Sequence, residues 1–125
     1  MRDYTHEEFI KKYEELAPAY PESLVNGDNT LKHMLSSKKV DQLIKLNKKL
    51  KLNDDFAHEV IDMLFESKNP VTLCEISCAA IYIDYRKDEA IKLIKKNLKK
   101  INNPPYVYMK EFFLRETCNI SISDK

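Results

Sequence analysis

The sequence predicts an all-α protein, and three observations carry that prediction. The chain of 125 residues contains a single glycine, whereas tight β-hairpins and phosphate-binding loops use glycine for their positive backbone angles. Apolar residues recur at helical spacing along most of the chain. All the prolines fall between these periodic segments, where helix boundaries belong. We therefore expect five to seven helices in one domain that spans residues 1–125.

The first helix has a complete start signal. Thr5 is the predicted N-cap, and Glu8 three residues later completes a capping box. Tyr4 and Phe9 are placed to pack across that cap as a hydrophobic staple. The helix is expected to end at the prolines that follow it. A second helical stretch runs to residue 50, and the Ser36-Ser37 pair leaves open whether residues 30–50 form one helix or two. Residues 5–50 thus supply the N-terminal helices.

Two helix pairs follow, over residues 54–84 and 87–117. The first pair begins at Asn53 or Asp54, either of which can cap a helix. Asn69-Pro70 and Asn103-Pro104 each open the second helix of a pair, with asparagine as N-cap and proline at the first helical position. Residues 71–83 are apolar nearly all round, which predicts the most buried helix of the protein. Residues 118–125 are expected to form a tail.

The two pairs resemble each other. Residues 59–64 (Glu-Val-Ile-Asp-Met-Leu) are similar to residues 89–94 (Glu-Ala-Ile-Lys-Leu-Ile), and the Asn-Pro step recurs. A helix–Asn-Pro–helix unit of this length looks like a HEAT-type repeat, in which one hairpin buries its apolar face only against a neighbour. From about Thr5 to Thr117 the chain resembles a family of small bacterial helical-repeat proteins, on this layout, on Asn69-Pro70-Val71 and on Ala79-Ala80.

That resemblance implies helical hairpins stacked as a short HEAT-like α-solenoid. It supplies no catalytic residues. The chain departs from the usual repeat at Thr72, where a basic residue often follows the helix-opening valine. Some small proteins of this kind look like immunity proteins of bacterial toxin systems, an analogy of size and fold.

The composition narrows the classes of partner and compartment. Charged residues make up 33% of the chain, but the formal net charge is only +1, which argues against a protein dedicated to nucleic acids or membrane surfaces. No signal peptide and no apolar run of the roughly 18–20 residues needed for a membrane span is visible. An odd number of cysteines fits free thiols in a reducing compartment. We expect a cytoplasmic protein.

The sequence favours no cofactor, metal or catalytic site. Cys74 and Cys78 share one helix face, but structural zinc needs four ligands, and core packing is the favoured interpretation. His6, His33 and His58 lie on separate segments without an evident nucleophile nearby. The sequence therefore predicts that the protein is not an enzyme.

Charge is segregated on two of the predicted helices. An acidic stripe comprises Asp55, Glu59, Asp62 and Glu66, and a lysine stripe comprises Lys92, Lys95, Lys96, Lys99 and Lys100. Both stripes can be ordinary solvated faces, which is what charge runs usually are. Alternatively, the acidic stripe suits a basic partner and the lysine stripe suits phosphates.

Aromatic residues are concentrated in the last helix, at Tyr106, Tyr108, Phe112 and Phe113. One helix cannot bury all of them against one neighbour. We expect one or two, together with Tyr82 and Tyr85, at the surface, where aromatics beside charges are typical of protein-binding hot spots. The alternative is that they cap the open end of the helical stack.

These features favour a non-catalytic protein-binding module, in its narrowest form an immunity protein that neutralises a cognate bacterial toxin by direct binding. The expected partner-binding residues are Asp55, Glu59, Asp62, Glu66, Tyr82, Tyr85, Tyr106 and Tyr108. The alternative is a nucleic-acid-binding helical repeat that uses the lysine stripe with Lys38, Lys39, Lys45, Lys48 and Lys49, which requires both lysine groups to share one surface. A deep pocket that held His58 with a carboxylate would instead favour an enzyme.

Overall fold

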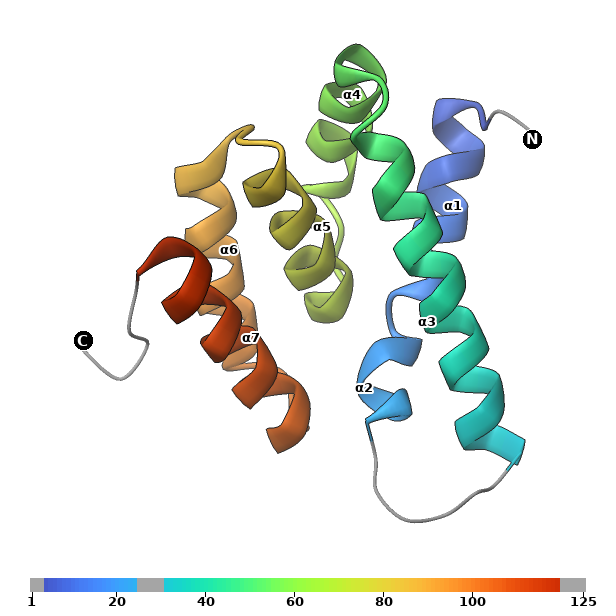
Figure 1. Cartoon of the computed structure of the whole chain (residues 1–125), viewed down its shortest axis with the longest axis vertical. Coiled ribbons are helices and arrows are strands. Elements are labelled where there is room, and N and C mark those ends of the chain that lie inside the picture. The colour runs from blue at the N-terminus through green and yellow to red at the C-terminus, as the bar shows by residue number, and fades with distance from the viewer. Residues whose placement is uncertain (1–3, 25–30, 120–125) are drawn as a thin grey trace.

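The computed structural model describes residues 4–24 and 31–119, and these residues form helices joined by short loops (Figure 1). These residues form seven helices and no strand, so the all-α prediction is confirmed. The helices are α1 (His6–Leu16), α2 (Ala19–Ser23), α3 (Leu31–Leu50), α4 (Asp54–Leu64), α5 (Pro70–Tyr82), α6 (Lys87–Leu98) and α7 (Pro104–Cys118). No helix within the described ranges is both long enough and apolar enough to cross a membrane.

The local start signals form as the sequence predicts. Thr5 accepts a hydrogen bond from the Glu8 backbone, and the Glu8 carboxylate accepts one from the Thr5 backbone, which completes the capping box. Asn53, Asn69 and Asn103 each cap a helix by accepting bonds from backbone N–H groups of its first turn. These caps satisfy donors that have no partner inside a helix, so the chain fixes the starts of α1, α4, α5 and α7 locally.

Two boundaries differ from the expected ones, and one open alternative is resolved. The short α2 follows α1 almost directly and contains Pro21, because a proline in a first turn gives up no helical hydrogen bond. α3 is one continuous helix through Ser36, whose side chain is buried. α7 extends through Cys118, and Asn119 ends it in the left-handed conformation. Residues 118 and 119 are therefore not tail, and residues 120–125 lie outside the described part.

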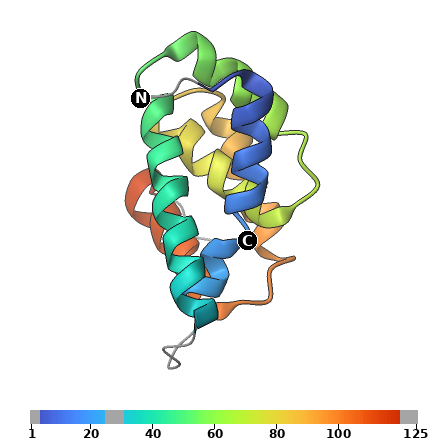
Figure 2. The ribbon, with the colours of Figure 1, turned by 90° about the vertical axis from the view of Figure 1, so that its right-hand side faces the viewer.

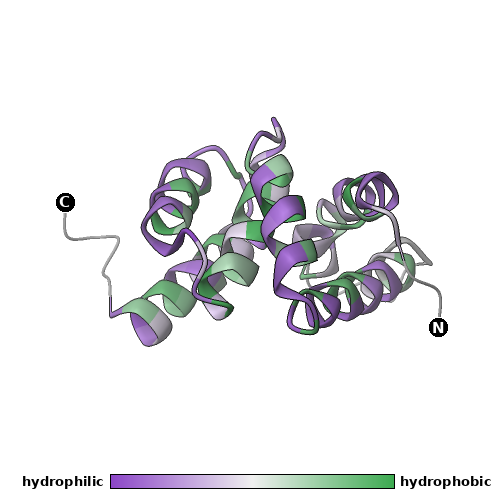
Figure 3. Ribbon diagram, turned by 90° about the horizontal axis from the view of Figure 1, so that it is seen from above, coloured by the Kyte–Doolittle hydropathy of each residue, from purple (hydrophilic) through white to green (hydrophobic). Residues whose placement is uncertain are grey.

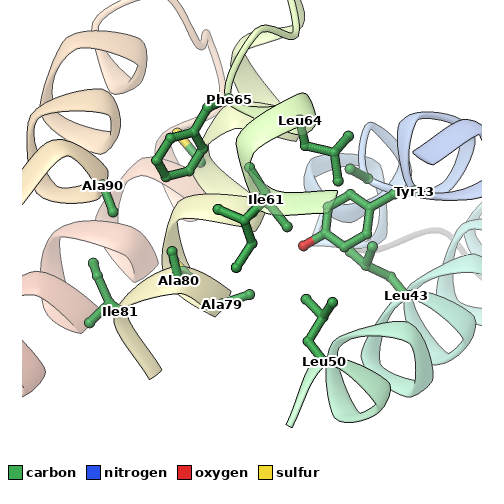
Figure 4. Packing of buried hydrophobic residues seen from close by; sticks show 14 of the residues in the cluster. Tyr13, Leu43, Leu50, Ile61, Leu64, Phe65, Ala79, Ala80, Ile81 and Ala90 are labelled. Atoms are coloured by element: carbon green, nitrogen blue, oxygen red, sulfur yellow. The ribbon is translucent and has the colours of Figure 1, made fainter. Parts of the chain in front are cut away.

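α5 forms the centre of the core, as predicted. Every residue from Thr72 to Ile81 is buried, and side chains from α1, α3, α4 and α6 converge on it (Figure 4). Figure 3 shows apolar residues mainly on the inward faces of the surrounding helices. Thr72 is also fully buried, so a basic side chain at this position would have no access to water.

The most extensive helix packing is between α5 and α6. Ala80 of α5 and Ala90 of α6 are both fully buried and lie across this contact (Figure 4), and small side chains let two helix axes approach. The most extensive packing therefore joins the two predicted hairpins to each other, rather than joining the helices within one hairpin. On the opposite side of α5, α1 and α3 run side by side (Figure 2).

Candidate functional site: a cleft above a buried ion pair

A cleft of about 400 Å³ opens between α3, α5 and α7. Each helix contributes residues spaced by three, four or seven positions, which places them on one helical face. The lining residues are Ile44, Asn47 and Lys48 from α3, Glu75, Cys78, Ala79 and Tyr82 from α5, and Met109, Lys110 and Phe113 from α7, with Tyr20, Lys51 and Ile83 from the segments beside these helices. A volume of this size is typical of protein sites for small ligands or inserted side chains.

An ion pair forms the floor of the cleft. Lys110 Nζ lies 2.7 Å from Glu75 Oε2, and both side chains are less than a tenth exposed. The Tyr106 hydroxyl donates a hydrogen bond to the same oxygen, Glu75 Oε2. Among the described residues none donates a hydrogen bond to the other oxygen, Oε1. Glu75 therefore offers a free acceptor position at the floor of the cleft.

The surroundings keep Lys110 charged and Tyr106 protonated. Burial alone would lower the pKa of Lys110, but the Cys78 sulfur and the Glu75 carboxylate outweigh burial and raise the pKa above its ordinary value. The ammonium also lies 5.0 Å from the centre of the Tyr20 ring, in cation–π contact. Burial, followed by the charge of Glu75, raises the pKa of Tyr106 far above its usual range. The pair is thus a fixed dipole rather than a source of protons at neutral pH.

The cysteines in this region are packed as thiols. Burial raises the pKa of Cys78 to about 12, although neighbouring Lys110 opposes that shift. Burial likewise raises the pKa of Cys74. Because the thiolate is the reactive and metal-binding form, neither side chain is prepared for nucleophilic attack near neutral pH.

The rim of the cleft is basic and aromatic. Lys48 at the end of α3 and Lys51 just after it are exposed, and Lys51 Nζ lies 5.3 Å from the centre of the Tyr82 ring across the cleft. Tyr82 packs edge-on against Phe113, with ring centres 5.4 Å apart. Since Glu75 and Lys110 neutralise each other, the net charge that faces an incoming ligand is positive.

The predicted partner-binding tyrosines have three different environments. Tyr82 and Tyr108 are exposed, at 62% and 65%. Tyr85 is half-buried, donates a hydrogen bond to Asp62 and stacks on His58 with ring centres 3.9 Å apart. Tyr106 is completely buried. The expectation that Tyr106 contacts a partner is therefore wrong, because its position on α7 turns the ring toward Glu75 instead of toward solvent.

The acidic stripe on α4 is partly neutralised within the protein. Asp55 and Glu66 are exposed. Glu59 lies 3.3 Å from the His6 ring, and Asp62 accepts hydrogen bonds of 2.8 Å from both Arg86 and the Tyr85 hydroxyl. Half of the stripe is thus engaged by imidazole, guanidinium or hydroxyl groups from other elements, and the Arg86 guanidinium weakens its negative field.

The two lysine groups lie on different sides of the molecule. Lys92 and Lys96 are exposed along α6, Lys95 is half-buried, and Lys99 and Lys100 are exposed just after its end. The other group extends along α3 and comprises Lys38, Lys39, Lys45, Lys48 and Lys49. Figure 1 shows α3 and α6 on opposite sides of α5. The structure therefore does not bring these helices together.

The histidines do not gather at the cleft. His6 and His58 stack on aromatic rings of other residues at the surface, and the side chain of His33 lies outside the described part. Within the described ranges, no three histidine, cysteine, aspartate or glutamate side chains are close enough together to hold a metal ion.

Sequence reasoning missed Glu75 and Lys110. The available signal was a single charged residue in the middle of an otherwise apolar helix, because such a charge must be paired when that helix is buried. The same applies to Lys110, which lies among the aromatic residues of α7. Comparison of the chain with protein-family models, curated proteins and solved structures found no match.

Proposed function

We propose that this protein is a non-catalytic protein-binding module and that it holds its partner in the cleft between α3, α5 and α7. The observation that carries the proposal is the cleft itself: apolar walls, an exposed tyrosine at the rim and a rigid ion pair at the floor. Protein-binding hot spots have this composition, with aromatic anchors around a desolvated pocket.

The chemistry of the cleft supports binding over catalysis. Cys78 is held as a thiol and Lys110 as an ammonium, so neither is a ready nucleophile. His58, which a deep pocket with a carboxylate would have made a candidate base, is instead stacked on Tyr85 and is not among the cleft residues.

The arrangement of charge supports a protein partner over nucleic acid. A basic surface that follows a phosphate backbone needs its lysines along one face, and the two lysine groups here belong to α3 and α6 on opposite sides of α5 (Figure 1). HEAT-like stacking of the two helix pairs is part of the proposal, since such stacks present broad surfaces for proteins.

Site-specific photo-crosslinking in the native host tests this function. A benzophenone amino acid in place of Tyr82 at the cleft rim should give a discrete protein adduct, whereas the same group in place of exposed Lys96 on α6 should not. Adding Ile44→Arg, which places a charge on an exposed apolar wall, should abolish the adduct. Adducts with nucleic acid, or protein adducts from Lys96 alone, would contradict the proposal.

A toxin-neutralising immunity protein is the narrower form of this function. The small size of the chain and a cleft wide enough for an inserted side chain of the toxin support it. Co-expression with the products of the neighbouring genes tests it. Rescue of growth from one toxic product is expected, and rescue should be lost in the Ile44→Arg variant. Rescue that Ile44→Arg leaves intact would place the toxin contact elsewhere.

A further inference from the structure

The floor of the cleft has an unused hydrogen-bond acceptor. Tyr106 and Lys110 both bind Glu75 Oε2, and within the described ranges Oε1 receives no hydrogen bond. Glu75 is only 3% exposed and lines the cleft. A ligand that carries an N–H or O–H group into the cleft can therefore donate a hydrogen bond to Oε1.

The apolar walls of the cleft favour a flat aromatic group in that ligand. Ile44, Met109 and Phe113 line the space beside Glu75, and flat aromatic groups gain most from such apolar and thioether surfaces. A lysine side chain would also donate to Oε1, but it would add an ammonium beside Lys110 and the rim lysines. The favoured donor is therefore neutral and aromatic.

The lysines at the rim favour acidic residues on either side of the inserted aromatic group. Lys48 and Lys51 stand at the mouth of the cleft, and neither forms an ion pair with a described residue. Carboxylates that flank the inserted group would pair with them, and like charges would be rejected. The same ammonium groups can contact the face of an aromatic ring.

We propose that the partner inserts a tryptophan side chain flanked by acidic residues into this cleft. The inference rests on the protein-binding function proposed above and names the recognised group. The indole N–H donates to Glu75 Oε1, the ring packs against Ile44 and Phe113, and the flanking carboxylates pair with the rim lysines. Tryptophan fits better than tyrosine because the indole is a donor only, so one hydrogen bond satisfies its single polar atom.

Tryptophan fluorescence provides the test, because this protein contains no tryptophan. The probe is the peptide acetyl-Glu-Glu-Trp-Glu-Glu-amide, titrated with the intact protein. Binding should shift the indole emission to the blue. Replacing tryptophan by 1-methyltryptophan, which lacks the N–H, should weaken binding about tenfold, as should replacing the glutamates by lysines.

Matched variants locate the site. Lys48→Glu combined with Lys51→Glu should abolish binding of the acidic peptide and favour the lysine-flanked one, whereas Lys38→Glu with Lys39→Glu, also exposed on α3, should leave binding unchanged. Equal binding of the methylated peptide would overturn the role of Glu75, and equal binding of the lysine-flanked peptide would overturn the role of the rim. If no peptide binds but Tyr82 still crosslinks a protein, the inference fails while the proposed function stands.

Discussion

Lys110 of α7 and Glu75 of α5 form a 2.7 Å ion pair inside the protein, where each side chain is almost fully shielded from water. α7 packs most closely against α6 and α2, so this pair and the Tyr106 hydrogen bond fix α7 relative to α5. The distance between these helices sets the width of the cleft. The pair therefore has a positioning role that an apolar contact would fill less specifically.

Breaking the pair on one side should destabilise the protein strongly. Lys110→Met leaves the Glu75 charge buried without its partner, and the free energy of unfolding should fall by about 3–5 kcal/mol in urea denaturation. In the double variant Glu75→Gln with Lys110→Met no charge is buried and the glutamine carbonyl still accepts from Tyr106, so the loss should be smaller. A double variant less stable than Lys110→Met would contradict this account.

Stability should fall as the pH becomes alkaline, and Cys78 should contribute to the fall. Its pKa is raised to about 12 by burial, above the value of about 8.5 for an unfolded thiol. Between these values the unfolded chain binds fewer protons than the folded one, so the stabilisation present below pH 8.5 is lost as the pH rises toward 12. Lys110 and Tyr106, whose pKa values are also raised, act in the same direction above about pH 10.

Urea denaturation at several pH values measures this dependence. Cys78→Ala should make the free energy of unfolding fall less steeply between about pH 8.5 and 10. Removing one titrating group lowers that slope by up to one proton, which is about 1.4 kcal/mol per pH unit. Cys118, which is only partly buried, supplies the matched control, and Cys118→Ala should flatten the decline less. Identical slopes in the parent and Cys78→Ala proteins would show that the thiol ionises as easily folded as unfolded.

The sequence predicted those features of the fold that depend on local chemistry. The caps at Thr5 and Asn69 are recognisable because the capping side chain and its backbone partners lie within one turn. The burial of residues 71–83 is recognisable because apolar residues cover all sides of the helix. Such signals do not need the positions of other helices.

The cleft could not be predicted in the same way. Glu75 and Lys110 lie far apart in the chain and meet only because α7 returns to α5. The helical period places Tyr106 and Tyr108 on different faces of α7, but it does not determine which of the two faces points inward. Tyr106 lies on the same face as Lys110 and Leu114, which are also buried. Only the tertiary packing decides this, and the expected set of surface tyrosines was wrong there.

Ile76→Asp should unfold the protein. Ile76 has no exposed surface in the middle of α5, and a buried unpaired carboxylate typically costs several kcal/mol, a large part of the stability of a small domain. Met63 on α4 is half exposed, so Met63→Asp provides the control with the same introduced charge. Circular dichroism melts should show loss of the transition in the first variant and retention in the second. A normal melt for Ile76→Asp would mean that α5 is not the core.

Ser77→Ala should stabilise the protein. The Ser77 hydroxyl is fully buried and forms no hydrogen bond with any residue that the structure describes. Removing it relieves the desolvation of an unpaired polar group, and alanine is the better helix former, for a combined gain of about 1 kcal/mol. Ser37 is partly exposed on α3, so Ser37→Ala measures the gain from helix propensity without the relief of desolvation. Ser77→Ala should exceed it in urea denaturation, and a loss of stability would reveal a partner for the hydroxyl.

Charge reversals on α4 should separate structural from partner-binding roles of the acidic stripe. Asp62 binds Tyr85 and Arg86, and Arg86 also binds Glu89 and covers the Phe65 ring at 4.7 Å. Asp62→Lys places an ammonium against this guanidinium, and stability should fall by about 1 kcal/mol, a small amount because these groups are partly exposed.

Glu66 is exposed at the end of the same stripe, and Glu66→Lys should change stability by less than about 0.5 kcal/mol. If the cleft is the binding surface, the yield of the Tyr82 crosslink should survive both reversals, since neither residue lines the cleft. Thermal melts and crosslink yields, measured on both variants, distinguish a structural role of the acidic stripe from a partner-binding role. A crosslink lost in Glu66→Lys, whose fold is unaffected, would assign the partner to the acidic stripe instead of the cleft.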